Sequence, residues 1–480
     1  MGSREGENPV TVRTAAARQP NQRLAALIHE AACSNAGLAR RVNMVGAEHG
    51  LDLRYDKTSV ARWLRGQQPR AMAPTLIAEA LGRKLGRPVT VEEIGMADGR
   101  NGSSSVGLHF APNVGAAIEE ATELWRADVS HREFLLGSSF AVAALIAPSR
   151  DWLITPPDPE VARPLTLAGR GPRIGPGDVY AIRAATKAFR DLDHQFGSGY
   201  VRAIVVHYLD EVVGEMLTGA YTERTGRALF SAAAQLTELA GYMAVDTGRH
   251  GLAQRYYIQS LRLSQAAGDR AYGGYVLAAG MSHLAGQLGS PREITQLARA
   301  AREGARDQAT ATARAMFNAA EARGHAVLGD ARSCEAALAR AASEMEKSDP
   351  SQDPDWIAHF TPAYLMDEFA HCYRDLDRPR QAKAHAEKAL AGHAERHVRR
   401  RAVDTVLVAT AYVQERDVEA ACAAGTMAID LLAQLRSHRG VEYLHDLDRR
   451  LDPYRETSAV RGFRERLGRL AVRQTAAAAA

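Results

Sequence analysis

The sequence contains little cysteine and little lysine. Its four cysteines, Cys33, Cys334, Cys372 and Cys422, lie far apart and form no C-x-x-C pair. This spacing excludes a disulfide framework and a zinc knuckle, and it favours a reducing cytoplasm as the compartment. Lysine supplies only 6 of the 60 basic residues. Such an arginine bias, together with abundant alanine, is typical of a GC-rich bacterial coding sequence, so arginine richness alone predicts no ligand.

Long hydrophobic runs and a large net charge are also missing. The apolar segment Phe134 to Pro148 is shorter than the ~20 residues that a membrane span needs, and we expect a buried helix there. No membrane partner is therefore expected. The net charge is +4 over 480 residues. The whole chain is thus not a polycation, and any contact with nucleic acid must be local.

Alternating β-branched runs are almost absent, and the apolar period is helical along most of the chain, which predicts an all-α protein. Glycine, serine and proline clusters suggest the divisions between its parts. The expected parts are a disordered N-terminus (1–20), a compact helical domain (21–97), a Gly/Ser linker (98–113), a helical spacer (114–147), a Pro-rich linker (148–177), a helical repeat domain (178–455) and a C-terminal tail (456–480).

The N-terminal domain shows start and stop signals for its helices. Ser34 and Asp56 are expected N-caps, because their side-chain oxygens can accept an unpaired backbone N–H, and Gly66 is an expected helix end. The expected helices are one with its apolar stripe at Leu24, Leu27 and Ile28, one from Asn35 to about Val45, one from Lys57 to Arg65, and one from Pro74 to Leu85.

Two stretches of this domain carry a resemblance. Ser34-x3-Leu38-Ala39-Arg40-Arg41-Val42 is followed by Thr58-Ser59-Val60-Ala61-Arg62-Trp63-Leu64-Arg65-Gly66 and by Pro69-Arg70. This pattern resembles the Cro/repressor (XRE-type) helix-turn-helix over residues 21–96, with a longer connection, Met44 to Asp56, than the family usually has. The resemblance implies a domain that binds double-stranded DNA and places the start of its third helix in the major groove.

The charge of the domain agrees with that expectation. Residues 21–90 carry eleven basic and five acidic residues, a surplus of six, so the positive field is concentrated there. The alternative is that these are ordinary solvated arginines. We expect base-edge contacts from Lys57, Thr58, Ser59 and Arg62, and phosphate contacts from Ser34, Asn35, Arg40, Arg41, Arg65 and Arg70.

Turn signals recur at a near-constant period in the C-terminal part. They begin at intervals of 41, 40, 48 and 39 residues, which predicts stacked antiparallel helical pairs, a solenoid. The five expected turns are Gly248-Arg249, Gly289-Ser290, Gly329-Asp330, Asp377-Arg378 and Arg416-Asp417.

Small and aromatic residues flank these turns in a repeated order. In the first unit they are Ala240, Gly241, Gly248, Ala253 and Tyr257, and later units repeat them at Ala370, Tyr373, Ala382, Ala389 and Leu390 and at Ala409, Tyr412, Ala421, Ala428 and Ile429. The pattern resembles the tetratricopeptide repeat. The resemblance implies a concave surface, lined by the first helix of each pair, that binds a peptide or another protein. The candidate residues there are Gln235, Tyr242, Asn318, Arg323, Tyr364, His371, Tyr373 and Arg374.

Metal and catalytic signals are weak. His393 and His397 lie four residues apart, a spacing that two metal ligands on one helix face can use, but Arg396 and the run Arg399 to Arg401 crowd cations around them. A solvated basic helix end is the favoured interpretation, and we expect no metal and no cofactor. No nucleophilic triad or carboxylate pair stands out, so we expect no enzyme. An enzymatic site within residues 114–230 stays open as an alternative.

The order of the parts resembles the large regulators of filamentous actinomycetes that control development and antibiotic production. The resemblance implies a cytoplasmic, nucleoid-associated transcriptional regulator, whose repeat domain senses a peptide, protein or small molecule. Dimerisation is expected because a lone helix-turn-helix buries little area, and two half-sites about 34 Å apart would suit a dimer. The alternative is a tetratricopeptide adaptor that acts through protein contacts without binding DNA.

Overall fold

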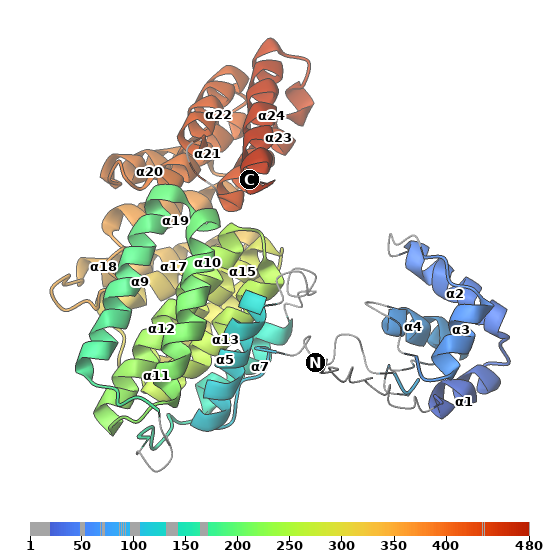
Figure 1. Cartoon of the computed structure of the whole chain (residues 1–480). Coiled ribbons are helices and arrows are strands. Elements are labelled where there is room, and N and C mark those ends of the chain that lie inside the picture. Colours follow the sequence, from blue (N-terminus) through green and yellow to red (C-terminus); the bar gives the residue numbers. More distant parts are fainter. Residues whose placement is uncertain are drawn as a thin grey trace, which may run out of the picture. The chain divides into compact units, whose positions relative to one another are not determined.

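The computed structural model describes residues 20–48, 53–67, 69, 73–85, 87, 89, 91, 93–96, 106–130, 143–163, 171–433, 435 and 437–479. Within these residues the chain forms helices and no strand longer than an isolated bridge, which confirms the all-α prediction. The chain divides into two compact units, Met1–Ser105 and Val106–Ala480 (Figure 1). The segment expected to be disordered, 1–20, lies outside the described residues except for the exposed Pro20.

Four helices make up the described part of unit 1, as predicted. The second helix packs against both the third and the fourth. Their apolar faces meet in a core that includes Leu24, Leu38, Val60, Trp63 and Leu81. The helices are α1 (Gln22–Glu30), α2 (Asn35–Glu48), α3 (Lys57–Leu64) and α4 (Ala73–Leu85).

The predicted caps of unit 1 are confirmed. The Ser34 hydroxyl accepts the amide of Gly37 at 3.1 Å, and α2 runs to Glu48, almost one turn beyond the predicted end. Asp56 and Ser59 form a capping box at the start of α3, and α3 ends before Gly66, whose φ is +88°. Both ends of α3 are therefore determined by local hydrogen bonds and by glycine's tolerance of the left-handed region.

The described end of the connection between α2 and α3, residues 53–56, is held by the side-chain amide of Asn43. Asn43 donates to the carbonyl of Tyr55 and accepts its amide, both at 2.9 Å. The Tyr55 ring then meets Trp63 edge-on, with the ring centres 5.0 Å apart. These contacts fix the approach of the chain to α3, so the extra length of the connection does not loosen that helix.

Unit 2 begins earlier than the sequence suggested. The expected linker 98–113 is wrong for residues 106–113, because Val106 is buried and the segment that follows it lies along the eighteen-residue helix α13 (His250–Ala267). Arg255 donates to the Val106 carbonyl, Gln259 donates to the Gly107 carbonyl, and Arg262 donates to the Ala111 carbonyl. The polar groups of α13 are thus satisfied by an extended segment that is far away in the sequence.

The expected helical spacer and Pro-rich linker are also part of this unit. Trp125 of α5 and Leu145 of α7 are fully buried in its core, so the described parts of the expected spacer, 114–130 and 143–147, are not a free spacer. Trp152, in the expected linker, is buried in the same core. Residues 148–154 of the expected Pro-rich linker belong to α7, and Pro148 lies inside that helix. Further along, Asp158 forms an ion pair with Arg262 at 2.8 Å. The expected linker is therefore partly helical and is held to α13, although many of its described residues are exposed.

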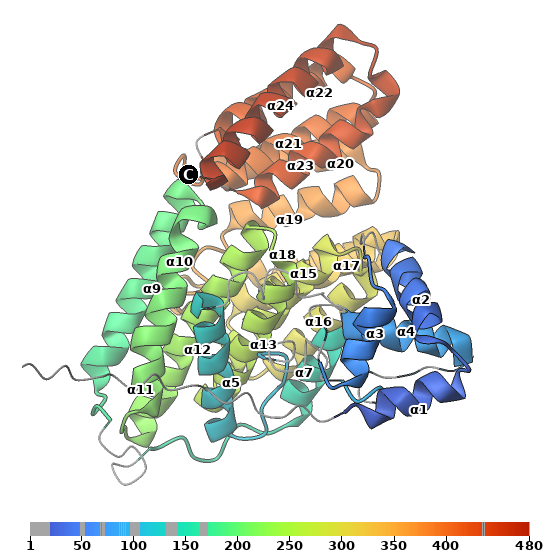
Figure 2. The same ribbon diagram turned by 45° about the vertical axis from the view of Figure 1, so that its right-hand side comes forward.

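Helices follow one another to the end of unit 2. Figure 1 shows α9, α10 and α12 side by side, and the later helices stack beyond them (Figure 2). The helices are α5 (Val114–Ser130), α7 (Ala143–Ile154), α9 (Pro176–Phe196), α10 (Ser198–Tyr208), η1 (Leu209–Val213), α11 (Gly214–Thr218), α12 (Glu223–Asp246), α13, α14 (Arg270–Tyr275), η2 (Val276–Met281), α15 (Ser282–Gln287), α16 (Pro291–Gly304), α17 (Ala311–Val327), α18 (Ala331–Glu346), α19 (Pro362–Asp375), α20 (Pro379–Gly392), α21 (Val398–Gln414), α22 (Val418–Leu432), α23 (His438–Arg450), η3 (Asp452–Tyr454) and α24 (Ser458–Ala479).

All five predicted turns join consecutive antiparallel helices. In each, the amide of the second turn residue donates to the carbonyl five residues earlier, as in Arg249 to Ala244 and Asp417 to Tyr412. The first turn residue has a positive φ in every case, from +55° at Asp377 to +74° at Gly248. This is the Schellman ending of a helix, repeated at each unit. The helical-pair solenoid is thus confirmed.

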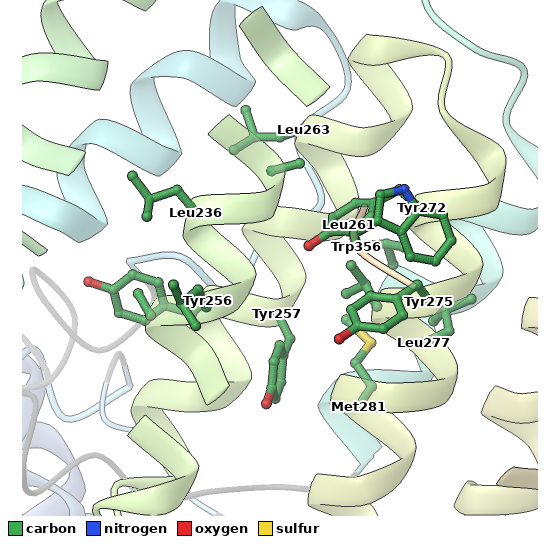
Figure 3. Close-up of a cluster of buried hydrophobic side chains, with 14 of the residues drawn as sticks. Leu236, Tyr256, Tyr257, Leu261, Leu263, Tyr272, Tyr275, Leu277, Met281 and Trp356 are labelled. Atoms are coloured by element: carbon green, nitrogen blue, oxygen red, sulfur yellow. The ribbon is translucent and has the colours of Figure 1, made fainter. Parts of the chain in front are cut away.

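Glycines allow the helices around Tyr257 to approach closely. A Cβ added at Gly241 of α12 would lie 3.0 Å from the Tyr257 ring, and one at Gly280 of η2 would lie 2.8 Å from it. Figure 3 shows Tyr272, Tyr275 and Trp356 gathered to one side of Tyr257, and the Tyr272 and Tyr275 rings stack with centres 5.4 Å apart. This aromatic cluster joins the first repeats into one core.

The C-terminal end differs from the expected tail. Residues 458–479 form α24, which packs against α22 and α23 through the buried Val460, Phe463 and Leu467. Helix α24 covers the apolar side of α22 with its own apolar side chains, and this contact ends the core at the C-terminal end of the solenoid.

Candidate functional sites

The exposed side of α3 presents the predicted cationic surface of unit 1. Lys57, Thr58 and Arg62 are exposed on α3, Arg65 is exposed just after its end, and Arg40 is exposed on α2. Within the described part of the chain, none of these four basic side chains forms an ion pair with a carboxylate. Their charges are therefore available to an external anion.

A short polar relay orients Arg62. Asp56 accepts the amide and the hydroxyl of Ser59, both at 2.8 Å, and Arg62 donates to the Ser59 hydroxyl oxygen at 3.3 Å. The hydrogen bonds from the Ser59 backbone and side chain lower the pKa of Asp56. The relay holds the capping carboxylate ionised and keeps the Arg62 side chain along the helix.

The predicted contact residues are not equally available. Ser59 is only 6% exposed and its hydroxyl caps α3, so its assignment to a base edge is wrong. Asn35 and Arg41 are half-buried, and the exposed Ser34 uses its hydroxyl as the cap of α2. Arg70 lies outside the described residues.

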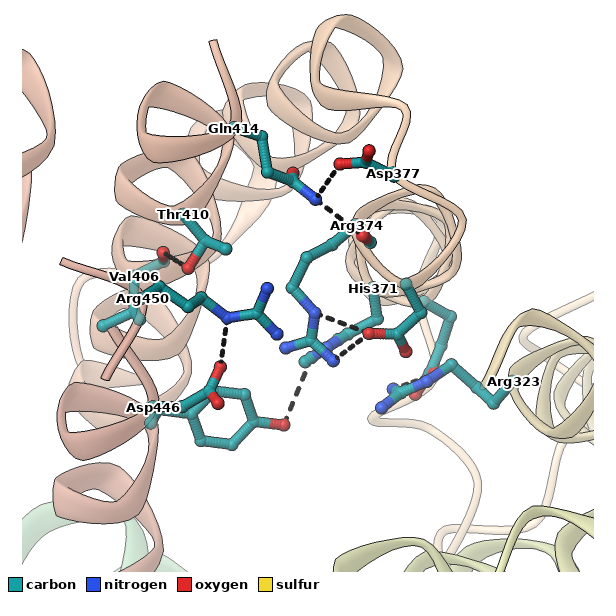
Figure 4. Close-up of polar contacts among 12 residues, drawn as sticks. Arg323, His371, Arg374, Asp377, Val406, Thr410, Gln414, Asp446 and Arg450 are labelled. Atoms are coloured by element: carbon teal, nitrogen blue, oxygen red, sulfur yellow. Dashed lines mark hydrogen bonds and ion pairs between the residues drawn. The ribbon is translucent and has the colours of Figure 1, made fainter. Parts of the chain in front are cut away.

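In unit 2 the first helices of the pairs face one another and form what we call the inner face, the side on which α12, α15, α17, α19, α21 and α23 meet. Arg323 of α17 pairs with Glu368 of α19 at 3.0 Å. Tyr443 of α23 meets His371 of α19, with the ring centres 5.5 Å apart. Figure 4 shows Arg374 lying between Arg323 on one side and Asp446 and Arg450 on the other.

Five predicted partner residues lie on or beside this inner face: Tyr242, Arg323, Tyr364, His371 and Arg374. They come from α12, α17 and α19, which are the helices that the repeat pattern assigned to the concave side. The prediction of a polar and aromatic surface there is therefore consistent with the geometry.

The other three predicted partner residues are placed differently. Asn318 is 4% exposed and accepts from Arg340 of α18 at 3.0 Å, so it lies inside its own helical pair. Tyr373 stacks on His385 of α20, with centres 5.4 Å apart, and is likewise used within its pair. Gln235 is half-buried and donates to Ser231 at 3.4 Å. Small shifts in helix rotation, which one sequence does not reveal, decide these positions.

The inner face is bounded by a contact between distant repeats. Ser437, just before α23, donates to Asp246 at the end of α12 at 2.7 Å. Arg399 of α21 pairs with Asp246 at 3.2 Å and with Asp193 of α9 at 3.0 Å, and it also donates to the Tyr242 hydroxyl at 2.7 Å. These bonds join the last repeats to the first ones across the inner face.

The expected solvated basic helix end at 396–401 is therefore wrong in part. Arg399 is 8% exposed and neutralised as above, and Arg400 pairs with Asp367 at 2.6 Å and lies 3.6 Å above the Tyr364 ring. His393 is also buried, and burial lowers its pKa to about 4. No group of three or more potential metal ligands occurs within the described residues.

Several inner-face residues escaped the sequence reasoning. Arg439 and Tyr443 of α23, Arg400 of α21 and His283 of α15 all surround the predicted residues. No local pattern marks them, because they are brought together only by the curvature of the stack.

A small cleft opens beside the inner face. Its volume is about 310 Å³, and its lining residues include Arg374, Asp375, Asp377, Gln414 and Arg450. Gln414 donates to Asp377 at 2.9 Å across one wall (Figure 4). The cleft is polar and close to charge balance, so it suits water or a polar group more than an apolar ligand.

Burial determines the protonation of the inner-face side chains. It lowers the pKa of His359 to about 3, with Arg190 and Arg400 acting in the same direction, and it lowers those of His283 and His371 well below the usual range. Burial also raises the pKa of Glu238 to about 7. The histidines are thus neutral at pH 7 and add no charge of their own.

The segment 114–230 uses its buried acids for structure. Asp128 pairs with Arg202 and accepts from the Tyr256 hydroxyl, and Asp193 pairs with Arg399. The Ser198 hydroxyl donates to Asp193 at 2.5 Å, but both side chains are buried and Asp193 is also held by Arg399, so this contact is structural as well.

No helix within the described residues is long and apolar enough to cross a membrane.

Residues 24–97 match the family model of the SP15 N-terminal domain, and this range corresponds to the helices of unit 1. No curated protein matches the chain. The matched range includes the cationic α2–α3 surface.

Proposed function

We propose that this protein is a sequence-specific DNA-binding transcriptional regulator whose unit 2 senses a signal. The observation that carries the proposal is the exposed cationic side of α3, where Lys57 at its start, Arg62 in its last turn and Arg65 just after its end have no carboxylate partner among the described residues. A short helix with free arginines at its exposed face, packed across a preceding helix that carries Arg40 and Arg41, suits the major groove and its flanking phosphates.

The proposed roles follow from position along α3. Lys57 and Thr58 lie at the start of the helix and Arg62 lies one turn further along, in its last turn. These three are assigned to base edges, where an arginine can donate two hydrogen bonds to guanine. Arg40, Arg41 and Arg65 are assigned to phosphates. The protein is proposed to act in the cytoplasm as a homodimer on two half-sites, because one unit of this size supplies few base contacts. Tetratricopeptide-like recognition by unit 2 is part of the same proposal, as is a role in development or secondary metabolism.

A mobility-shift experiment with sheared genomic DNA at two salt concentrations tests the proposal. The triple variant Arg40→Ala, Arg41→Ala and Arg62→Ala removes three proposed contacts. Binding should weaken strongly, and the slope of log affinity against log salt should flatten by about 2 to 3, since each lost phosphate contact contributes about 0.9.

The matched control removes three charges from the end of α4 instead, with Arg83→Ala, Lys84→Ala and Arg87→Ala. This control should bind nearly as the parent does, because Arg83 and Arg87 already pair with Glu79 and Glu30. If the parent protein shifts no DNA, or if both triple variants weaken binding equally, the DNA-binding proposal fails. The adaptor alternative, in which unit 2 acts through protein contacts alone, then takes its place.

A further inference from the structure

Arg439 stands out on the inner face because its charge is not neutralised. It is half-buried, and its Nε atom is fully buried without a hydrogen-bond partner. Within the described residues it forms no hydrogen bond and no ion pair. A buried N–H without a partner costs free energy, so a guanidinium with no carboxylate beside it in the wall of a surface indicates a place for an external anion.

The neighbouring arginines do not share this property. Arg323 is paired with Glu368, Arg399 with Asp193 and Asp246, and Arg400 with Asp367. Each carboxylate of those pairs is therefore already used. These four carboxylates balance the charge of the four arginines in number, but each is bonded to Arg323, Arg399 or Arg400, so within the described residues Arg439 has no direct carboxylate partner.

Hydrogen-bond donors from several helices surround Arg439. Tyr443 lies one turn after Arg439 on α23, and Tyr242 and Tyr364 are close enough to affect the pKa of Arg439, which is raised although burial opposes its charge. Burial likewise raises the pKa of Tyr242 and Tyr364, so their hydroxyls stay protonated and able to donate. The Tyr443 hydroxyl lies 3.5 Å from Nε2 of His371. These groups can supply further donors to an oxyanion held by the guanidinium.

We propose that Arg439 anchors a binding site for a small organic oxyanion, a metabolite that carries a carboxylate or a phosphate group. Both groups match the planar fork of an arginine, which donates two parallel hydrogen bonds to them. Tyr242 of α12, Tyr364 of α19 and Tyr443 of α23 provide the remaining donors. The site deepens the proposed sensor role of unit 2, on which it rests, by giving the signal a chemical class.

The closure of the inner face argues for a compact ligand. Ser437 and Arg399 join α23 and α21 to the end of α12, so the inner face is bounded at the very place where Arg439 lies. An extended peptide would have to displace these buried bonds to follow the face from the first repeat to the last. A ligand of metabolite size needs no such displacement.

A ligand there would bridge the two ends of the solenoid. Arg439 and Tyr443 belong to α23, whereas Tyr242 belongs to α12. Binding would therefore stabilise the closed arrangement relative to any arrangement in which these helices separate, which is the form of coupling that a sensor requires.

Thermal unfolding of the full chain, followed with citrate in one arm and inorganic pyrophosphate in the other, tests the site. Sodium chloride at matched ionic strength is the reference. We expect a saturable rise in the unfolding temperature in one of the two arms, and that arm identifies the group as carboxylate or phosphate. Arg439→Gln should weaken the response at least tenfold. Arg332→Gln, a change of the same type at an exposed position on α18, should leave it unchanged.

The same variants distinguish a binding role from a structural one. Without added anion, Arg439→Gln should unfold at the parent's temperature or above it, because it removes an unpaired buried charge. Arg439→Lys, which keeps the charge but loses the fork, should also respond less. No saturable rise in either arm, or an equal rise in Arg439→Gln, overturns the proposal.

Binding is measured without DNA, so the result is independent of the mobility shift. Anion binding combined with failed DNA binding would keep the site and remove only the proposed output. Anion binding that changes the mobility shift of the parent, and not of Arg439→Gln, would support both.

Discussion

Replacing Arg399 tests whether the inner face is held closed by buried charge. Its side chain is 10% exposed, and it neutralises Asp193 and Asp246, whose side chains are 1% and 0% exposed. The substitution Arg399→Met keeps most of the apolar stem but leaves two buried carboxylates without a cation. Breaking a buried pair from one side typically costs about 3–5 kcal/mol, and the lost hydrogen bond to Tyr242 adds about 1 kcal/mol.

The assay is urea denaturation of the full chain, followed by far-ultraviolet circular dichroism at pH 7. The control is Arg396→Met, an exposed arginine three residues earlier, whose loss should change the unfolding free energy by no more than about 0.5 kcal/mol. A triple variant that also carries Asp193→Asn and Asp246→Asn should recover much of the stability, because the uncompensated charges are gone. Equal effects of Arg399→Met and Arg396→Met would refute the reasoning and restore the solvated helix end.

Three further outcomes are expected. The pKa of Glu238 is about 7 in the fold, and 4.5 is its ordinary value. The protonated acid therefore contributes stability that is fully present below pH 4.5 and is lost as the pH rises through 7. In pH-dependent denaturation Glu238→Gln should gain stability relative to the parent over that range, and a difference that does not change with pH would contradict this. Gly280→Ala should destabilise the protein by about 1–3 kcal/mol, because the added Cβ would lie 2.8 Å from the Tyr257 ring. Gly462→Ala, which has open space around it in α24, should stabilise the protein by up to about 1 kcal/mol in the same denaturation experiment. Arg416→Gly should raise the thermal unfolding midpoint, with a gain of up to about 1 kcal/mol, since an arginine at φ +66° is strained; a fall in the midpoint would show that the strain is absent.

Local chemistry made a large part of the fold predictable. Ser34, Asp56 and Gly66 act within one helical turn of their own positions, and each does what its residue type suggested. The five repeat turns follow the same logic. Even Asp377 and Arg416, which lack glycine's freedom, take the left-handed conformation because the repeating helical pairs require it.

The candidate sites were predictable only in part. The cationic residues of α3 could be named because a helix eight residues long has few faces, and its apolar residues identify the buried one. Ser59 was misassigned because a capping box turns that side chain inward. On the solenoid, Asn318 and Tyr373 were misassigned because a small rotation of α17 or α19 decides between the inner face and the paired helix.

Glycine and proline content was the least reliable guide. It suggested linkers at 98–113 and 148–177, yet their described residues belong to unit 2 and are tied to its helices. The reason is the polar row on α13, which satisfies the backbone carbonyls of Val106 and Ala111 and ties down Asp158. A segment without regular structure can pack firmly when a neighbouring helix supplies the hydrogen bonds that it cannot make for itself.

The amino-acid sequence by itself determined the helices, their caps and the spacing of the repeat turns, because each of these depends on hydrogen bonds and steric preferences within a few residues. Only the tertiary structure decided which charges are neutralised. Arg399 and Arg439 look alike in the sequence, yet the first meets two buried carboxylates and the second meets none. That difference arises from the curvature of the stacked pairs, which brings α23 back to α12 and which no local pattern encodes.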